Sequence, residues 1–370
     1  MIRLFILSFI LLFYLNLQAY DFNSKSENYI AMDYNSKTIL FENNADAKMV
    51  PSSMSKLMTL YVVFSKLKSG SIKLTDAYKV STYAWKKGGS SMFLDPRKKA
   101  TVSDLIHGLV VVSGNDAAIT LAEGIAGTEE DFVQSMNSTA QAIGLTNSHF
   151  ANATGWPHPD HMMSPRDLLT LSIKIFEDFP EYRYLFSDKS FTYNKIYQPN
   201  TNELLWSNVG VDGMKTGSTE EGGFGLALTA KRDDRRIFAV FNGLKSKKER
   251  RQEGERLVKY IFNNFGDKKI FSAGQEISSM DVLFGESRKI DIFTNEDVYI
   301  TYKHGEEEQI KVIASHNDII KAPVERGQEL GCLKIYIPGQ ELREVPLYAR
   351  EDIKEASFIK KALYKLKFLF

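Results

Sequence analysis

The sequence predicts an α+β protein with two folded domains. Within residues 25–265, short β-type runs lie toward both ends and apolar helical patterns lie between them, which favours one sheet backed by helices. The last third changes to short alternating or β-branched runs separated by glycine-, asparagine- and proline-bearing turns, which is typical of a small all-β sandwich. The chain has 370 residues, 43% of them hydrophobic, and is long and apolar enough for both cores.

The first 19 residues are predicted to be a secretory signal peptide. Arg3 supplies the positive start, residues 4–15 are almost wholly apolar, and a small-residue cleavage site ends at Ala19. The apolar run is short for a helix that spans a membrane, although an uncleaved anchor is the alternative. We therefore expect a secreted protein.

Composition excludes several functional classes. The formal net charge is +1, so no global field favours nucleic acid as a partner. The single cysteine, Cys332, excludes an intrachain disulfide and a cysteine-based metal cluster, and we expect it to pack in a core. His149, His158 and His161 lack the spacing of a zinc-binding helix, so we expect no metal and no cofactor.

The first elements are a predicted hairpin, residues 29–33 and 38–42, and then a helix that follows Pro51. Apolar residues recur in this helix at spacings of three and four: Met54, Leu57, Met58, Tyr61 and Val62. Ser53 falls in the first turn with Lys56 three residues later, so the hydroxyl and the amine are neighbours on the helix surface.

The proximity of the Ser53 hydroxyl and the Lys56 amine suggests nucleophilic catalysis. A serine hydroxyl becomes a good nucleophile when a base takes its proton, and a lysine is a base only when burial or a second cation lowers its pKa. Ser65–Lys68 and Ser357–Lys360 share the spacing but lie in a lysine-rich helix end and a basic tail. Ser53 and Lys56 are therefore the candidate nucleophile and base, and the alternative is an ordinary helix start with a surface lysine.

Two further helices, residues 101–112 and 117–125, are separated by a short polar break. Ser113 and Asn115 lie in that break, between segments that are otherwise apolar. Buried polar side chains need partners, so these two residues are either helix caps or members of a site. Later helices are predicted for residues 132–143 and 165–176.

Lys215, Thr216 and Gly217 stand at the edge of a predicted strand. Strands follow at residues 225–230 and 237–244, and a charged helix at 247–262. We expect the lysine to supply a second cation near Lys56, the threonine to donate a hydrogen bond, and the glycine to allow close approach of a substrate. The backbone N–H of Ser218, paired with that of Ser53, is a candidate oxyanion hole.

Ser-x-x-Lys, Ser-x-Asn and Lys-Thr-Gly, in this order, are the signature of penicillin-binding proteins and class A β-lactamases. The chain resembles a low-molecular-mass penicillin-binding protein, a serine-type D-alanyl-D-alanine carboxypeptidase. Residues 90–94, 112–117, 150–155 and 321–324 carry the resemblance beyond the three motifs. It implies a transpeptidase-like domain, with an antiparallel sheet and helices, over residues 25–265.

The resemblance implies acyl transfer from a peptidoglycan stem peptide that ends in D-Ala-D-Ala. Ser53 forms the acyl-enzyme, Lys56 is the base, Ser113 relays a proton and Asn115 holds the peptide amide. The residues that the resemblance implies for substrate binding are Lys215, Thr216, Gly217 and Ser218. It also implies a substrate-binding arginine, which is Arg250 by counting from Lys215. The family often has histidine where this chain has Ser218. The resemblance also implies that penicillins acylate Ser53.

Three alternatives compete with the carboxypeptidase. A class A β-lactamase needs a glutamate between the second and third motifs to activate water, and residues 132–176 contain none. An endopeptidase that cuts peptide cross-links would use the same catalytic residues. A non-catalytic peptidoglycan-binding protein is disfavoured because the acylation residues are all present.

The C-terminal third is predicted to hold a β domain at residues 268–349 and a helical tail at residues 350–370. The tail's apolar residues share one face of a helix, and lysines lie on the other. About fifteen residues at ~1.5 Å each are too short to cross a bilayer, so we expect the helix to lie on the membrane surface. With the resemblance, this implies a periplasmic protein attached to the outer face of the inner membrane.

Overall fold

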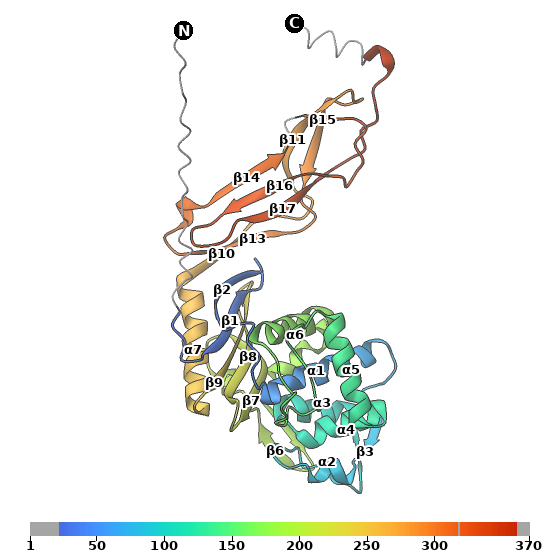
Figure 1. Ribbon diagram of the computed structural model, residues 1–370, viewed down its shortest axis with the longest axis vertical. Coiled ribbons are helices and arrows are strands. Elements are labelled where there is room, and N and C mark those ends of the chain that lie inside the picture. Colours follow the sequence, from blue (N-terminus) through green and yellow to red (C-terminus); the bar gives the residue numbers. More distant parts are fainter. Residues whose placement is uncertain (1–21, 317–318, 361–370) are drawn as a thin grey trace, which may run out of the picture. The chain divides into compact units, whose positions relative to one another are not determined.

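The structure is a computed structural model that describes residues 22–316 and 319–360. The predicted signal peptide and residues 361–370 of the predicted tail lie outside the described residues. The chain divides into two compact units, with the first spanning Phe22–Lys268 and the second beginning at Lys269 (Figure 1). Each unit is described by itself.

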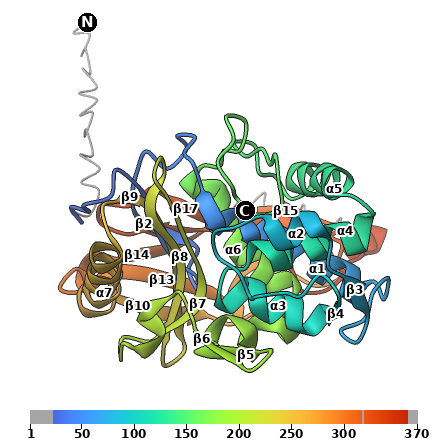
Figure 2. The same ribbon diagram turned by 90° about the horizontal axis from the view of Figure 1, so that it is seen from below.

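The first unit is built on an antiparallel five-stranded sheet with the order β2-β1-β9-β8-β7 (Figures 1 and 2). Its strands are β1 (Asn28–Asp33), β2 (Thr38–Asn43), β7 (Val211–Thr219), β8 (Gly223–Arg232) and β9 (Arg235–Leu244). The N-terminal hairpin pairs with β9, about 200 residues later in the chain. This confirms the predicted sheet with strands from both ends of the unit, and it leaves β7 at one edge.

Helices cover both faces of the sheet, with α7 on one side and the other helices on the opposite side (Figure 1). The α-helices are α1 (Lys56–Lys68), α2 (Thr82–Lys86), α3 (Val102–Val111), α4 (Asn115–Ala126), α5 (Glu129–Ala142), α6 (Pro165–Asp178) and α7 (Lys247–Asn264). Short 3-10 helices are η1 (Ser52–Ser55), η2 (Pro180–Ser187) and η3 (Glu203–Trp206). Two small hairpins complete the unit: β3 (Ala77–Lys79) with β4 (Lys99–Thr101), and β5 (Ser190–Tyr193) with β6 (Ile196–Pro199).

Helix α1 is the centre of the helical layer. Every residue from Lys56 to Phe64 is buried, not only the apolar face that the sequence pattern indicates. The helix packs against α4, α5 and α6, so no side of its first half meets solvent. The first turn of α1 therefore places a lysine amine inside the protein.

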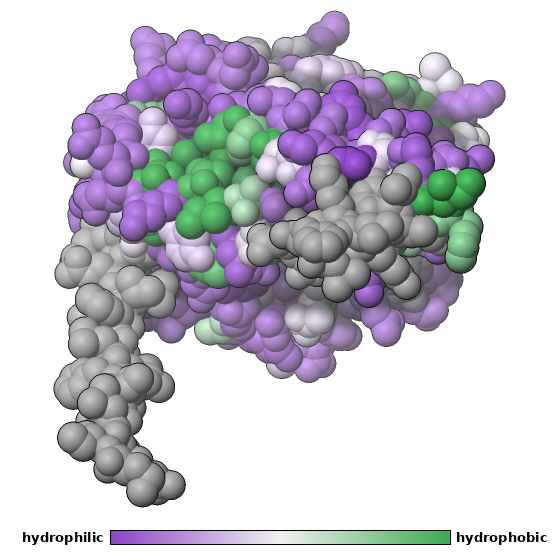
Figure 3. All heavy atoms as spheres, turned by 90° about the horizontal axis from the view of Figure 1, so that it is seen from above, coloured by the Kyte–Doolittle hydropathy of each residue, from purple (hydrophilic) through white to green (hydrophobic). Residues whose placement is uncertain are grey.

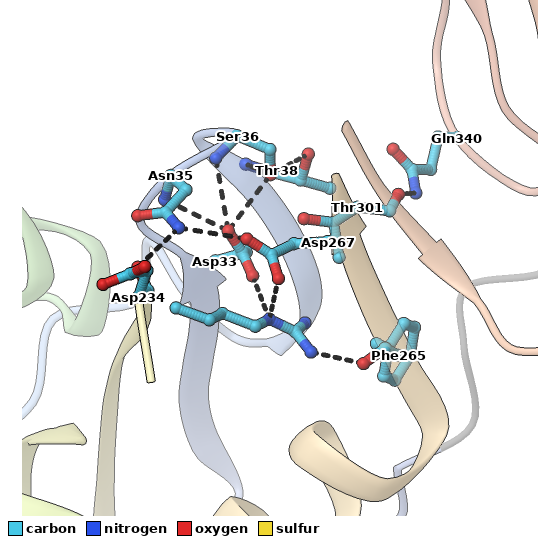
Figure 4. A network of polar contacts seen from close by, with 10 residues as sticks. Asp33, Asn35, Ser36, Thr38, Asp234, Phe265, Asp267, Thr301 and Gln340 are labelled. Atoms are coloured by element: carbon cyan, nitrogen blue, oxygen red, sulfur yellow. Dashed lines mark hydrogen bonds and ion pairs between the residues drawn. The ribbon is translucent and has the colours of Figure 1, made fainter. Parts of the chain in front are cut away.

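A buried ion pair ties the N-terminal hairpin to the end of the first unit. Arg235 Nε lies 2.7 Å from Asp33 Oδ2, and Asp33 is fully buried. The guanidinium also donates to the carbonyl oxygen of Phe265, and Asn35 Nδ2 donates to Asp267 Oδ2 at 3.0 Å (Figure 4). The turn between β1 and β2 is thereby fixed beside Phe265 and Asp267, at the end of the first unit.

The second unit is all β, as the sequence predicts. A six-stranded sheet has the order β14-β16-β17-β12-β11-β15, and β10 pairs with β13. The strands are β10 (Phe265–Phe271), β11 (Glu276–Leu283), β12 (Lys289–Phe293), β13 (Val298–Lys303), β14 (Lys311–His316), β15 (Ile319–Lys321), β16 (Glu329–Tyr336) and β17 (Arg343–Ala349), with a short 3-10 helix η4 (Glu307–Gln309). Between β16 and β17, Gln340 Nε2 donates to the carbonyl oxygen of Thr301 at 2.7 Å (Figure 4).

The expectation that Cys332 packs in a core is wrong. Leu333 and Ile335 of β16 are buried in this unit's core, whereas Cys332 is only half-buried. Successive side chains of a strand face opposite sides of the sheet, so a neighbour of Leu333 points away from that core. The thiol is free.

The predicted tail helix does not begin at residue 350. Ile353 forms a bridge to Val324 and Glu355 to Gly285, and Ile353 and Ala356 are buried against this unit. Helical backbone starts only at Phe358, whose side chain is exposed. The apolar side chains of residues 350–356 are used by the β core, which is why this stretch is extended.

Large apolar side chains also remain exposed on the second unit, including Val312, Ile313 and Ile319. Figure 3 shows apolar surface among hydrophilic surface in the view from above. Within the described part of the chain, we find no helix with the length and hydropathy that a membrane crossing requires.

Candidate active site

Ser53 and Lys56 meet at the junction of η1 and α1. Lys56 Nζ lies 2.9 Å from Ser53 Oγ, 2.8 Å from Asn115 Oδ1 and 2.5 Å from the carbonyl oxygen of Thr154. The lysine is fully buried, whereas Ser53 is partly exposed. The pair therefore has its base inside the protein and its nucleophile at the surface of a cleft.

Burial lowers the pKa of the Lys56 amine from its usual 10.5 to about 7, and the nearby Asp116 carboxylate opposes the shift. A large fraction of the amine is then neutral at physiological pH. A neutral amine at hydrogen-bond distance can accept the proton of Ser53. The sequence predicts that the charge of Lys215 helps to lower the pKa of Lys56, but desolvation is the main cause of the lowered pKa.

Ser113 lies in the break between α3 and α4, in a left-handed backbone conformation with φ of +63°. Its buried hydroxyl has no hydrogen-bond partner among the described residues, and it lines the same recess as Ser53. A polar group that is buried without a partner is uncommon and calls for an explanation. A substrate or a water molecule in the recess would supply the missing partner.

Asn115, the first residue of α4, is already engaged at both ends of its amide. Its Oδ1 accepts from Lys56, and its Nδ2 donates to the carbonyl oxygen of Gly88 at 3.0 Å. The resemblance implies that this side chain holds the substrate amide. In the structure its contacts orient the Lys56 amine and the loop before residue 90.

Lys215, in the middle of β7, is buried next to the site. The residue is 1% exposed, and its amine donates to the carbonyl oxygen of Thr216 at 3.0 Å. Burial, and then the charges of Lys56 and Arg250, lower its pKa well below the usual value.

Arg250, not Arg251, points into the site from the first turn of α7. Arg250 is 5% exposed and its Nη2 donates to the carbonyl oxygen of Thr201 at 3.1 Å. Arg251 is half-exposed and pairs with Glu255 on the same helix. Thr216 Oγ1 donates to Thr201 Oγ1 at 2.8 Å, so Thr201, which the sequence did not single out, joins both groups.

Two recesses flank Ser53, and Ser218 lines both of them. The first recess, about 310 Å³, is lined by Ser113, Thr201, Thr216, Gly217, Lys247 and Arg250, together with Glu203. The second recess, about 300 Å³, is lined by Asn115, Thr154, Gly155, Trp156, Thr219 and Glu220. The nucleophile therefore stands between two places where the two parts of a substrate can lie.

Two carboxylates that the sequence did not single out hold the walls of this site. Asp116 accepts from Ser91 Oγ at 2.7 Å and from the backbone N–H groups of Met92 and Leu94. Glu129 accepts from the N–H of Ala153 at 2.8 Å, next to the Thr154 carbonyl that contacts Lys56. Asp116 directly follows the Ser-x-Asn motif, which is a usable signal, whereas Glu129 has no signal of its own.

The buried histidine near the site is a packing residue. His161 is 2% exposed, packs edge-on against Phe150, and accepts from the N–H of Ala151 at Nδ1. Burial, and then the charge of Lys56, lower its pKa to about 3, so the ring is neutral at physiological pH. The described residues contain no group of histidine, cysteine or acidic side chains that could hold a metal ion.

A serine beside a buried lysine, between a helical layer and the edge strand of an antiparallel sheet, defines the class of penicillin-recognising serine enzymes that act through an acyl-enzyme. The family model described as D-alanyl-D-alanine carboxypeptidase matches residues 16–245. A second model, for the C-terminal domain of penicillin-binding protein 5, matches residues 265–355. The chain belongs to the D-alanyl-D-alanine carboxypeptidase family, serine peptidase family S11.

Individual relatives agree with this assignment over nearly the whole chain. D-alanyl-D-alanine carboxypeptidase DacA of Haemophilus influenzae is 36% identical over 344 residues, which cover 91% of this chain and 87% of the relative. DacC of Escherichia coli is also 36% identical, with 89% of this chain and 84% of the relative covered. The crystal structure of penicillin binding protein 5 from H. influenzae superposes with a TM-score of 0.85 at 36% identity, covering 91% and 99% of the two chains.

The chain is therefore a serine-type D-Ala-D-Ala carboxypeptidase with a penicillin-binding fold and a C-terminal β domain. This confirms the main functional prediction over the endopeptidase and the non-catalytic binding protein.

Proposed function

We propose that Ser53 is the nucleophile and Lys56 the general base in the removal of the last D-alanine from peptidoglycan stem peptides. The contact of 2.9 Å between Lys56 Nζ and Ser53 Oγ carries this proposal. Ser53 Oγ attacks the carbonyl carbon of the penultimate D-alanine while the neutral amine of Lys56 accepts the hydroxyl proton. The N–H groups of Ser53 and Ser218 stabilise the oxyanion.

The leaving D-alanine occupies the first recess. Its C-terminal carboxylate binds to Arg250 and to Thr216, which line that recess. The proton on Lys56 passes through Ser113 Oγ to the nitrogen of the departing D-alanine as the C–N bond breaks. The Ser113 hydroxyl, which has no hydrogen-bond partner in the part of the chain that the structure describes, supports this relay.

Water completes the cycle by hydrolysis of the ester on Ser53. Lys56 accepts a proton from the water, the C–O bond to Ser53 breaks, and the serine regains its proton. Asn115 keeps the Lys56 amine in position by accepting a hydrogen bond from it. Penicillins, whose strained amide mimics D-Ala-D-Ala, acylate the same Ser53 oxygen.

The decisive experiment measures D-alanine release from a diacetyl-Lys-D-Ala-D-Ala peptide by the mature chain in detergent. Ser53→Ala should abolish release and the covalent label from a fluorescent penicillin. Ser65→Ala is the matched control, because Ser65 begins another Ser-x-x-Lys sequence but its hydroxyl donates to the Tyr61 carbonyl oxygen of its own helix. Release that survives in Ser53→Ala would refute the assignment of the nucleophile.

We also propose that the protein acts in the periplasm, at the outer face of the inner membrane. The predicted signal peptide supports export, and the lysine-bearing apolar tail supports attachment to a membrane surface. Since residues 350–356 belong to the β domain, the attachment is limited to the stretch from Phe358 onward.

A further inference from the structure

The two recesses beside Ser53 differ in charge. The first recess carries the cations Lys247 and Arg250 together with Glu203. Among the described residues that line the second recess, Glu220 is the one charged side chain. A substrate that spans both recesses should therefore be anionic on one side of the scissile bond and cationic on the other.

Glu220 is held next to the nucleophile by the turn that carries it. Thr219 Oγ1 lies 2.8 Å from the hydroxyl of Ser52, which directly precedes Ser53, and it accepts from the N–H of Gly222 at 2.9 Å. A Cβ added to Gly222 would lie 2.9 Å from the carbonyl oxygen of Val50, so the turn is packed tightly against this segment. The carboxylate is exposed to solvent but its backbone is fixed at the rim of the second recess.

Trp156 also lines the second recess. Its ring is partly exposed, at 42%, and it offers an apolar surface along which a chain of methylene groups can lie. Lys87 Nζ lies 5.3 Å from the centre of this ring but does not line the recess. A cationic group of a substrate in this recess would be repelled by Lys87 and attracted by Glu220. Its charge should therefore lie next to Glu220.

We propose that the second recess binds the ammonium-bearing side chain of the residue that precedes the two D-alanines, with Glu220 as its counter-charge and Trp156 as its wall. This inference rests on the proposed function, because the leaving D-alanine occupies the first recess and the acyl part of the substrate must lie on the other side of Ser53. An extended peptide advances about 3.3–3.6 Å per residue, so this preceding residue reaches the second recess. The ligand class is a diamino acid side chain with a free terminal amine.

The test compares two peptides that differ only in that amine. One is Nα-acetyl-Lys-D-Ala-D-Ala, with a free ε-amine, and the other is diacetyl-Lys-D-Ala-D-Ala, in which the ε-amine is acylated. Exposed ion pairs are weak, so the native enzyme should favour the free amine by about two- to fivefold in kcat/KM. Glu220→Gln should abolish this preference, because it should lower kcat/KM for the free-amine peptide more than for the diacetyl peptide.

Glu221→Gln is the matched control, since Glu221 is the exposed neighbour in the same turn, carries the same charge and does not line the recess. It should keep the preference for the free amine. An unchanged preference in Glu220→Gln, or a loss that is equal in both variants, would overturn the proposed recess. Inactivity of the native enzyme on both peptides would instead overturn the proposed function, and this inference with it.

Discussion

The amine of Lys56 is a base because of its surroundings. It contacts the oxygens of Ser53, Asn115 and Thr154, but it is buried and no carboxylate touches it, among the residues that the structure describes. Desolvation penalises its charged form more strongly than these contacts favour it, so its pKa is lowered. The three-residue spacing to Ser53 is visible in the sequence, whereas the burial that makes the spacing useful is not.

This chemistry predicts an acidic limb in the pH profile. The protonated amine cannot accept the serine proton, so acylation should rise as pH increases through about 7 and reach a plateau above it. At pH 6, acylation should be roughly tenfold below the plateau. The measurement is the second-order rate constant of acylation by a fluorescent penicillin between about pH 5 and 9. His161, with its pKa of about 3, cannot account for this limb, and a midpoint near 10 would contradict it.

Arg250 should act on substrate binding through its charge. A charge-assisted hydrogen bond contributes about 1.5–3 kcal/mol, so Arg250→Gln should lower kcat/KM for D-alanine release about 10- to 100-fold. Arg251→Gln is the matched control on the same helix and should be close to native. A peptide whose C-terminal carboxylate is amidated should show little difference between the native enzyme and Arg250→Gln. Equal losses in the two arginine variants would contradict the assignment.

At the scale of elements, the loop between α5 and α6 connects a distant carboxylate to the catalytic amine. Glu129, at the start of α5, is buried and accepts from the N–H of Ala153 and, at 3.1 Å, from Tyr83 Oη. Thr59 of α1 donates to the Ala153 carbonyl oxygen at 2.7 Å. The carbonyl group of Thr154, which orients Lys56, is therefore fixed from two sides.

We expect Glu129 to be a positioning residue. Glu129→Ala removes both acceptors, so kcat/KM should fall about 10- to 100-fold, as for the loss of one charge-assisted hydrogen bond. The acidic limb should also move to lower pH, because the Thr154 carbonyl oxygen favours the charged amine and its displacement would lower the pKa of Lys56 further. The pH dependence of penicillin acylation measures this shift.

Two variants make this prediction specific. Glu129→Gln keeps an oxygen that can accept from Ala153 and should stay within a few-fold of native. Glu130→Ala changes the exposed neighbour and should have no effect. A slow Glu129→Ala variant with the native pH profile would show a general structural role instead.

The sequence predicts elements and motifs better than it predicts the contacts between them. Local patterns predict the helix after Pro51, the strand that carries Lys215, and a sheet built from strands near both ends of the first unit. The partner of Glu129 lies 24 residues away in an irregular loop, and no periodicity marks such a contact. The burial of Lys215 could not be predicted either, because a motif gives the order of residues, whereas burial depends on what packs against the strand.

At the scale of the whole molecule, the chain uses its last described residues to complete the second unit. The backbone of Ile353 exchanges hydrogen bonds with Val324 at 2.8 and 2.9 Å, and the N–H of Ala356 donates to the Phe284 carbonyl oxygen at 2.7 Å. Ile353 is 3% exposed and Phe358 is 87% exposed. The sequence pattern predicts a single helix over residues 350–370, since apolar residues are common both in a β core and in a membrane-facing helix.

A truncation that removes the predicted membrane anchor should therefore end after Ala356, so that the β domain stays complete. A chain of residues 20–357 should leave the membrane fraction, because it lacks the predicted anchor, and should retain a native second unit. A chain of residues 20–349 should also leave the membrane, but it loses the buried Ile353, and large-to-small changes at such sites cost about 2–5 kcal/mol. Its strands β11, β12 and β17 should therefore exchange amide hydrogen faster, measured by mass spectrometry on both truncated chains and the full chain. Retention of residues 20–357 in the membrane would refute the tail as anchor, and equal exchange in the two truncated chains would refute a stabilising role for residues 350–356.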